Sequence, residues 1–367
     1  MDDGAADAAA DAATDAAAEH ATLGRAVNVD VLNKQPWLPF IRLDPKSHVY
    51  FHKEGPDAEE RAVPRSGTRC VDALTDVSGL FFPNAKFDDM YERGRIRRID
   101  GYSMLQTKEE KLDEWAGASK RGTAIHANLE EMVVNSVPKE RWTDDQRAVA
   151  AHLEDLSRLE DLEVIGTEVS VYYTKEEEAE EGAEPPAKRA RRAVAAGQVD
   201  LLLKRRVCED EDHDDELVIV DYKVTKDLPT AGGHAYGVNM EPAFFPENTP
   251  ANKHNKYATQ LALYATMVKQ LWLKHYGRSC KVKDLRVLHV SPSNRNVVTE
   301  ILLPDFSKEA AAYLDSLPAD GSRTTKENEI VRLLDAEKKR NEEFRSALER
   351  ERVERKRRLD EGLEDRF

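Results

Sequence analysis

The spacing of hydrophobic residues predicts three helices in the central part of the chain. Between residues 119 and 134 these side chains recur three or four positions apart, which is the period of a helix with one buried face. A second helix is predicted over 143–160, where Thr143 can cap the first turn. A third is predicted over 253–276, and Gly277 is the residue type that commonly follows a helix.

Five shorter runs rich in Val, Ile, Leu and Tyr predict strands. Three of them follow the second helix, and two follow the third. This order is typical of an α/β protein in which helices flank a central mixed β-sheet. The predicted strands are residues 163–173, 194–204, 217–224, 284–290 and 297–303.

The chain is expected to form one large domain over residues 37–306, followed by a charged helical extension over 307–367. Within the extension, residues 324–363 predict a long helix in which Arg and Glu dominate. Polar residues interrupt its hydrophobic positions, which disfavours a sustained coiled coil. Residues 1–22 consist largely of Ala and Asp and are expected to be a disordered tail.

Residues 174–192 are expected to form a flexible, charged loop inserted between two strands. They contain an acidic run, two prolines and the basic cluster Lys188–Arg192. The cluster fits a short nuclear-import signal, and it could also contact a DNA backbone. A solvated loop is the simpler interpretation of the same residues.

Composition narrows the class of protein. Hydrophobic residues make up 40% of the 367 residues, enough to bury one core, and no run of 18 apolar residues predicts a membrane span. The first residues lack the basic start and apolar centre of a signal peptide, so an intracellular protein is expected. The three cysteines have no CxxC spacing, which argues against a disulfide framework or a cysteine zinc site.

The net charge of −15 is concentrated in two segments. Residues 1–20 contribute −6, and residues 208–216 contribute −7. The rest of the chain is nearly neutral and can present a basic surface. The acidic total therefore does not exclude DNA or RNA as a partner.

Two predicted strands each place one acid among hydrophobic residues. These acids are Asp200 and Asp221, and Lys223 follows two positions after the second. Residues two apart in a strand share a face, so Asp221 and Lys223 are expected to point the same way. A hairpin closed by the acidic segment 208–216 would bring Asp200 beside Asp221.

Two carboxylates in apolar strands repel one another, and a divalent cation removes that repulsion. Hard oxygen ligands select Mg²⁺ or Mn²⁺. A nearby lysine can stabilise the charge that develops on a phosphate during hydrolysis. The pattern therefore predicts a metal-dependent phosphodiester hydrolase, although a structural salt bridge between Asp200 and Lys223 is an alternative explanation.

Four short motifs occur in one order along the chain. They are Gly122-Thr123-Ala124-Ile125-His126 with Glu130, then Gly197-Gln198-Val199-Asp200, Asp221-Tyr222-Lys223, and Gln260 with Tyr264. This series resembles the PD-(D/E)XK nuclease superfamily in its RecB-like exonuclease branch, which reads GTxxHxxxE, GxxD, DYK or DWK, and QxxxY. The resemblance covers roughly residues 45–305 and neither tail. It departs from the usual pattern at Val224, where the branch usually has Thr.

The resemblance implies a restriction-endonuclease-like core and a Mg²⁺- or Mn²⁺-dependent nuclease that acts on DNA as an exonuclease does. It implies that the imidazole, the two aspartates and one backbone carbonyl bind the metal. It also implies that the glutamine and the tyrosine contact a substrate phosphate or the lysine. The implied metal ligands are His126, Asp200, Asp221 and Tyr222, and the implied catalytic residues are Asp200, Asp221, Lys223, Gln260 and Tyr264.

Two further acids are candidates for supporting roles. Glu130 lies one turn after His126 and projects from the same helix face, so it is expected to support the site. A solvent-facing pair on an amphipathic helix is the alternative for these two residues. Glu168 lies in a predicted strand and is either a further site carboxylate or an exposed acid.

Other functions remain compatible with this sequence. An RNA endonuclease of the same fold is one, and a catalytically silent nucleic-acid-binding module is another. An acidic adaptor that acts through its tails would leave the acids inside the strands unexplained. The chain has no GxxxxGK[ST] motif for an ATP-driven motor of its own, so a helicase or a replication or repair protein is a candidate partner.

Overall fold

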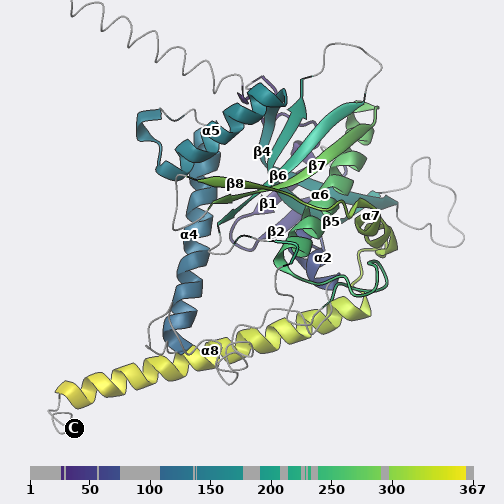
Figure 1. Ribbon diagram of the computed structural model, residues 1–367. Helices are drawn as coiled ribbons and strands as arrows, with labels where there is room; N and C mark the ends of the chain where they lie inside the picture. The colour runs from purple at the N-terminus through teal and green to yellow at the C-terminus, as the bar shows by residue number, and fades with distance from the viewer. Residues whose placement is uncertain are drawn as a thin grey trace, which may run out of the picture. The chain divides into compact units, whose positions relative to one another are not determined.

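A mixed five-stranded sheet forms the centre of the computed structural model (Figure 1). Its strands lie in the order β4-β5-β6-β7-β8, and only β6 and β7 are parallel to each other. The five predicted strands and their order along the chain are therefore confirmed. The strands are β4 (Leu162–Glu176), β5 (Arg191–Arg205), β6 (Asp215–Val224), β7 (Cys280–Val290) and β8 (Val298–Leu302).

The structure describes most of the chain outside its N-terminal region. The predicted tail 1–22, most of the predicted loop 174–192 and most of the acidic segment 208–216 lie outside the described residues. No helix in the described part is both long and apolar enough to cross a membrane. The described residues are 26–74 apart from 29, 56 and 57, and 108–134, 137, 139–176, 191–206, 214–224, 228, 230–232, 239–290 and 297–360.

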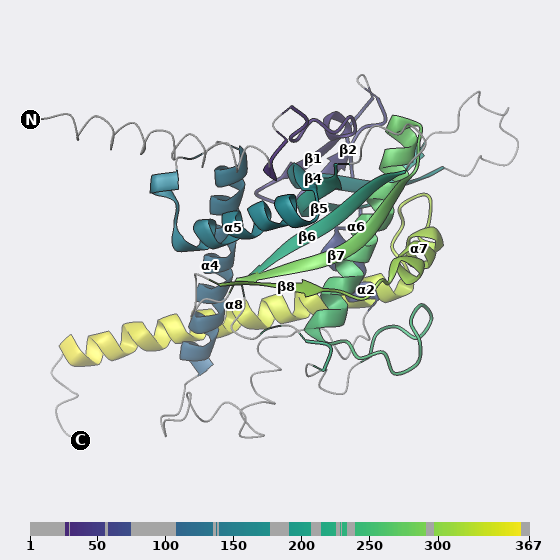
Figure 2. The same ribbon diagram turned by 45° about the horizontal axis from the view of Figure 1, so that its top comes forward.

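Helices cover both faces of the sheet (Figures 1 and 2). The C-terminal half of α4 (Lys108–Val134) and α5 (Asp144–Leu159) share one buried hydrophobic cluster with alternate residues of the strands, such as Leu201 and Val220. Helix α6 (Lys253–Tyr276) packs against β4, β5, β6 and β7, and α7 (Ser307–Ser316) packs against α6. The strands are thus buried on both sides, as their nearly continuous hydrophobic runs require.

Local capping signals explain where two of these helices begin and end. Thr143 forms a capping box with Gln146 at the start of α5. Asn252 caps the start of α6, and Gly277 ends it in the left-handed conformation with φ 68°. The predicted bounds of α6 are confirmed. Helix α4 begins eleven residues before its predicted start, over a stretch of good helix formers without a clear hydrophobic period.

A small antiparallel sheet near the N-terminus was not predicted from the sequence. It contains β1 (Ile41–Asp44), β2 (Val49–His52) and β3 (Arg61–Ala62). Figure 2 shows β1 and β2 lying over β4 and β5, with which they make contacts. The short helix α2 (Gly67–Ala73) follows and contacts α6 and β5. These strands are two to four residues long, too short to give a clear alternating pattern.

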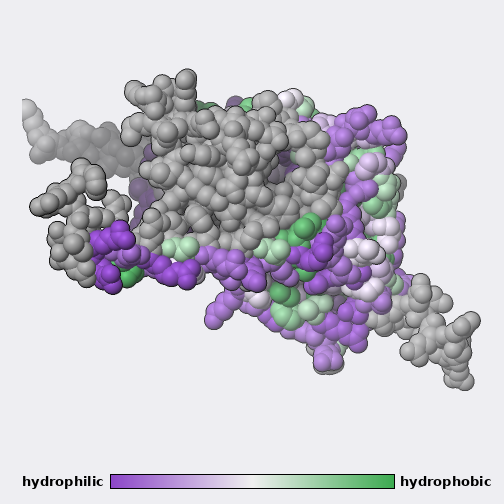
Figure 3. Space-filling view, turned by 90° about the horizontal axis from the view of Figure 1, so that it is seen from below, coloured by the Kyte–Doolittle hydropathy of each residue, from purple (hydrophilic) through white to green (hydrophobic). Residues whose placement is uncertain are grey.

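The described residues divide into two compact units. The first contains both sheets and continues to Ser322, so α7 belongs with the sheet rather than with the extension predicted after residue 306. The second contains residues 108–116 and helix α8 (Thr325–Asp360), which occupies most of the range predicted as a long helix. Figure 3 shows mostly hydrophilic residues along α8.

Candidate functional site

The residues of the recognised motifs meet where α4 crosses the central strands. The antiparallel pairing of β5 with β6 aligns Leu201 with Val220, which places Asp200 opposite Asp221 at the next position. The backbone N–H of Tyr222 donates a hydrogen bond of 2.7 Å to Oδ2 of Asp200. The predicted juxtaposition of the two aspartates is therefore confirmed.

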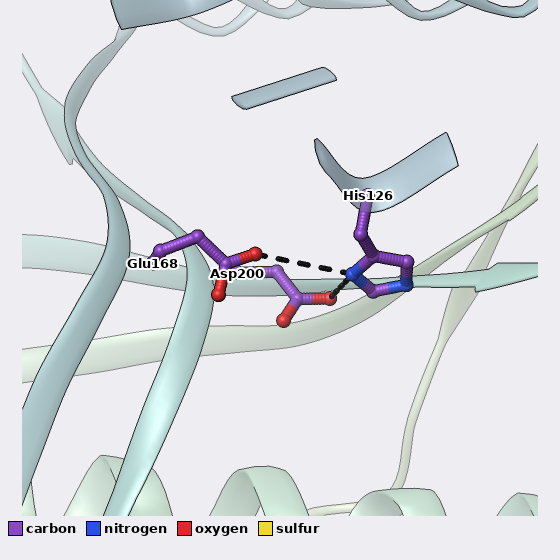
Figure 4. A group of neighbouring side chains, drawn as sticks. All are labelled: His126, Glu168 and Asp200. Atoms are coloured by element: carbon purple, nitrogen blue, oxygen red, sulfur yellow. Dashed lines mark ion pairs between the residues drawn. The ribbon is translucent and has the colours of Figure 1, made fainter. Parts of the chain in front are cut away.

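The imidazole of His126 lies between two groups of oxygen atoms. Its Nδ1 is 3.4 Å from Oδ2 of Asp200 and 3.9 Å from Oε1 of Glu168. Dashed lines in Figure 4 mark both pairs. Its Nε2 is 3.1 Å from the backbone oxygen of Tyr222. Within the described part of the chain, His126, Glu168 and Asp200 bring their ligand atoms within 4.8 Å of one another, close enough to hold one metal ion.

Glu168 reaches this site through an uncommon backbone conformation. Its φ is +48°, in the left-handed region that residues other than Gly rarely adopt. On either side of it, Thr167 pairs with Leu201 and Val169 pairs with Val199, so Glu168 lies opposite Asp200. Its side chain is 22% exposed and points toward His126 (Figure 4). Glu168 is thus a partly buried neighbour of the imidazole and not an exposed acid of the strand surface.

Negative charge accumulates around Asp200 and His126. Burial, and then the nearby Asp221, raise the pKa of Asp200 well above its ordinary value. Burial alone would lower the pKa of His126, but Glu168, Asp200 and Asp221 outweigh it and raise that pKa. Neighbouring carboxylates thus contribute to both shifts.

Lys223 is held by an acid and by an aromatic ring. Its Nζ forms an ion pair with Oδ2 of Asp221, so the two side chains share a face as predicted. The alternative considered from the sequence was a salt bridge with Asp200. The same Nζ lies 5.1 Å from the ring centre of Tyr257 on α6. Burial lowers the pKa of Lys223, but Asp221 and Asp200 raise it by more than burial lowers it. The side chain is therefore charged.

Tyr257 was not singled out by the sequence analysis. It lies three positions before Gln260 on α6, so both project from one side of that helix. This spacing was the available signal, but a tyrosine at helical spacing is also common in a core. Only the contact with Lys223 shows that Tyr257 belongs to the site.

Gln260 and Tyr264 contact each other. Nε2 of Gln260 donates a hydrogen bond of 2.9 Å to the hydroxyl of Tyr264. The ring of Tyr264 lies against the backbone of two glycines: a Cβ would stand 2.4 Å from it at Gly67 and 2.2 Å at Gly197. The first residue of the GxxD motif therefore makes room for the last residue of the QxxxY motif.

Two further residues adjoin the site. Burial, and then Glu168, raise the pKa of Glu130, which lies on α4 one turn after His126. Tyr50 on β2 is buried, and its pKa is raised by burial and by Glu168 and Asp200. One small cavity is lined by His126, Leu129, Glu130, Thr167, Glu168, Asp200, Leu201 and Tyr222.

Comparison of the chain with known protein families and with curated proteins finds no match. An imidazole, three carboxylates and a charged lysine around one backbone carbonyl can bind a divalent cation and an anionic substrate together.

Proposed function

We propose that this protein is a metal-dependent nuclease that hydrolyses DNA phosphodiester bonds in the manner of an exonuclease. The observation that carries the proposal is the convergence of His126, Asp200 and Asp221 with the charged Lys223. These residues come from α4, β5 and β6, which are separated by up to about a hundred positions in the sequence. The mixed sheet between helices supports a restriction-endonuclease-like core as part of the same proposal.

The donor set suits Mg²⁺ or Mn²⁺. Carboxylates and a carbonyl oxygen are hard ligands, and imidazole suits several transition metals. Nε2 of His126 lies 3.1 Å from the backbone oxygen of Tyr222, whereas its Nδ1 faces the carboxylates of Asp200 and Glu168.

The proposed ligands are His126, Asp200, Asp221 and the carbonyl of Tyr222, with Glu130 and Glu168 in support. Burial, and then the charge of Asp221, raise the pKa of Asp200, and a cation would offset the repulsion between the two carboxylates. A bound divalent cation supplies two things: an electrophile for the phosphate and a lowered pKa for water.

Lys223 provides the second positive charge. Its ammonium group remains protonated at neutral pH, because Asp221 and Asp200 favour the charged form. Asp221 and the ring of Tyr257 restrict where the ammonium can lie. A fixed cation of this kind stabilises negative charge that develops on phosphate oxygens in the transition state. Tyr257 is thus proposed to position Lys223.

The test is cleavage of defined nucleic acids by the full-length protein. End-labelled linear DNA, circular DNA and RNA are each incubated with Mg²⁺, Mn²⁺ or EDTA. We expect linear DNA to be degraded with either metal and to survive in EDTA. Cleavage of circular DNA would indicate an endonuclease, and preferential cleavage of RNA would favour an RNA endonuclease.

Two variants separate the roles of the site residues. Asp200→Asn should lower cleavage by about 10²-fold or more and abolish the rise in melting temperature caused by Mn²⁺. Lys223→Ala should retain that rise and lose turnover, because its proposed role is charge stabilisation. The control is Glu216→Gln, which alters an acid on β6 that pairs with Arg205 at 2.9 Å. Cleavage by Asp200→Asn at the wild-type rate would refute the assignment, and DNA binding without cleavage in any metal would favour the silent module.

A further inference from the structure

A second polar cavity lies near the opposite end of β5 from the candidate site. Arg192 is eight residues before Asp200 on this strand, which corresponds to about 25 Å. The cavity has a volume of about 100 Å³. It lies among β2, β3 and the beginning of β5, and its polar lining residues are His52, Glu54, Glu59, Arg61, Arg191 and Arg192.

Two buried nitrogen atoms of these lining residues lack hydrogen-bond partners in the described part of the chain. One is Nε2 of His52, a residue that is only 6% exposed and whose ring packs 4.6 Å from that of Tyr172. The other is Nε of Arg192. Buried polar atoms nearly always have a partner, and a group bound in the cavity can supply one for these two atoms.

Three arginines and two glutamates line the cavity, and one of these, Glu54, accepts a hydrogen bond of 2.8 Å from the backbone N–H of Arg191. The guanidinium group of Arg191 also pairs with Glu176 at 3.1 Å. Lys274 is also nearby, with its Nζ 5.9 Å from the ring centre of Tyr172. Burial, and then the charge of Arg191, lower the pKa of Lys274, while Glu54 acts in the opposite direction.

We propose that this cavity binds a tetrahedral oxyanion, namely a phosphate group. Guanidinium groups present paired N–H donors that match phosphate oxygens, and a neutral imidazole supplies one more donor. A cavity of about 100 Å³ has room for a phosphate group. The site is independent of the proposed nuclease function, because it uses none of the same residues.

The first test measures the melting temperature of the full-length protein in inorganic phosphate and in NaCl of equal ionic strength. We expect a saturable rise of about 3 °C at ten times the dissociation constant in phosphate only. Arg192→Gln should lose this rise. Arg205→Gln, at the other end of β5 and paired with Glu216, should retain it.

A second variant tests the proposal if Arg192→Gln does not fold. Arg61 is exposed, so Arg61→Gln should fold normally and weaken the phosphate effect. The absence of a phosphate-specific rise in the wild type would overturn the proposal. A rise of the same size in both Arg192→Gln and Arg61→Gln would overturn it as well.

The source of the phosphate group is distinguished by DNA binding in EDTA. Contact with a DNA backbone predicts that Arg192→Gln lowers the salt dependence of single-stranded DNA binding by about one unit of slope. A free or small-molecule phosphate predicts an unchanged slope together with the loss of phosphate stabilisation. Either result supports the oxyanion site, whereas unchanged phosphate stabilisation and unchanged slope contradict it.

Discussion

Glu168 carries the least common backbone conformation among the site residues. It is held at φ +48° in the middle of β4, and its carboxylate lies beside the imidazole of His126. The left-handed region costs roughly 1–2 kcal/mol for a residue with a Cβ. Such strain is often found at functional sites, where the surrounding structure enforces it. We therefore expect the conformation at this position to lower the stability of the free protein.

At Glu168 we expect the order of stability of a Gly variant and an Ala variant to be the reverse of that in a regular strand. In a regular strand Gly is less stable than Ala by about 0.5–1 kcal/mol. Because Gly adopts positive φ freely, Glu168→Gly should be more stable than Glu168→Ala by about 1 kcal/mol, as measured by urea unfolding. Both variants should lose nuclease activity if the carboxylate supports the site.

Ser170 provides the matched control on the same strand. It pairs in regular register with Gln198, so Ser170→Gly should be less stable than Ser170→Ala. If Glu168→Gly also unfolds at a lower urea concentration than Glu168→Ala, the positive φ carries no strain.

At the scale of secondary-structure elements, Tyr264 joins α6 to its neighbours. Its ring lies against the backbone of Gly67 at the start of α2 and of Gly197 in β5. The close approach requires residues without a Cβ at both positions. It also sets the distance between α6, which carries Tyr257, and the strand that carries Asp200.

Substitution of Gly197 tests this contact. A Cβ there would stand 2.2 Å from Cε1 of Tyr264, so Gly197→Ala should lower the free energy of unfolding by about 1–3 kcal/mol. Removing the ring provides the space, so the double variant Gly197→Ala/Tyr264→Ala should lose less than the sum of the single losses. Urea unfolding of the three variants measures this coupling.

Gly122 on α4 supplies the control for the same substitution. Nothing lies within 4 Å of a Cβ added there, and Ala favours a helix, so Gly122→Ala should raise stability by up to about 1 kcal/mol. Strict additivity of the two changes at Gly197 and Tyr264 would show that the ring does not restrict Gly197.

At the scale of the whole molecule, the ionisation of His52 makes the stability of the folded protein depend on pH. Burial, together with the charge of Lys274, lowers the pKa of His52 to about 4. In the unfolded chain the pKa of His52 is near 6.5. Between pH 4 and pH 6.5 the unfolded chain therefore binds a proton at His52 that the folded protein does not bind. His52 therefore contributes stability above pH 6.5, and this contribution is lost as the pH falls toward 4. Asp200 and His126, whose pKa values are raised, act in the opposite direction.

The prediction compares the pH dependence of stability in the wild type with that in the variant His52→Phe. His52→Phe keeps an aromatic ring against Tyr172 but removes the titrating group. Between pH 6.5 and pH 4 the variant should lose on the order of 2 kcal/mol less stability than the wild type. Urea unfolding at several pH values measures this difference, and parallel curves for the two proteins would contradict it.

Much of this fold was predictable because its signals are local. The hydrophobic runs of the five strands and the caps of α5 and α6 depend on residues close together in the sequence. The β1–β3 sheet escaped prediction because its short strands depend on packing over β4 and β5. The boundary after residue 306 was set by a change in composition, whereas α7 belongs with the sheet because it packs against α6.

The sequence by itself determined which chemistry was available: His126, Asp200, Asp221 and Lys223 in ordered motifs, on a predicted helix and two predicted strands. Period-two alternation also determined that Asp221 and Lys223 share a face. Only the tertiary structure decided that Tyr257 contacts Lys223 and that the ring of Tyr264 lies between two glycines. It also decided that the cavity around His52 and Arg192 exists. The physical reason is that each of these features joins residues on different elements, and their contact depends on how whole faces pack rather than on any local pattern.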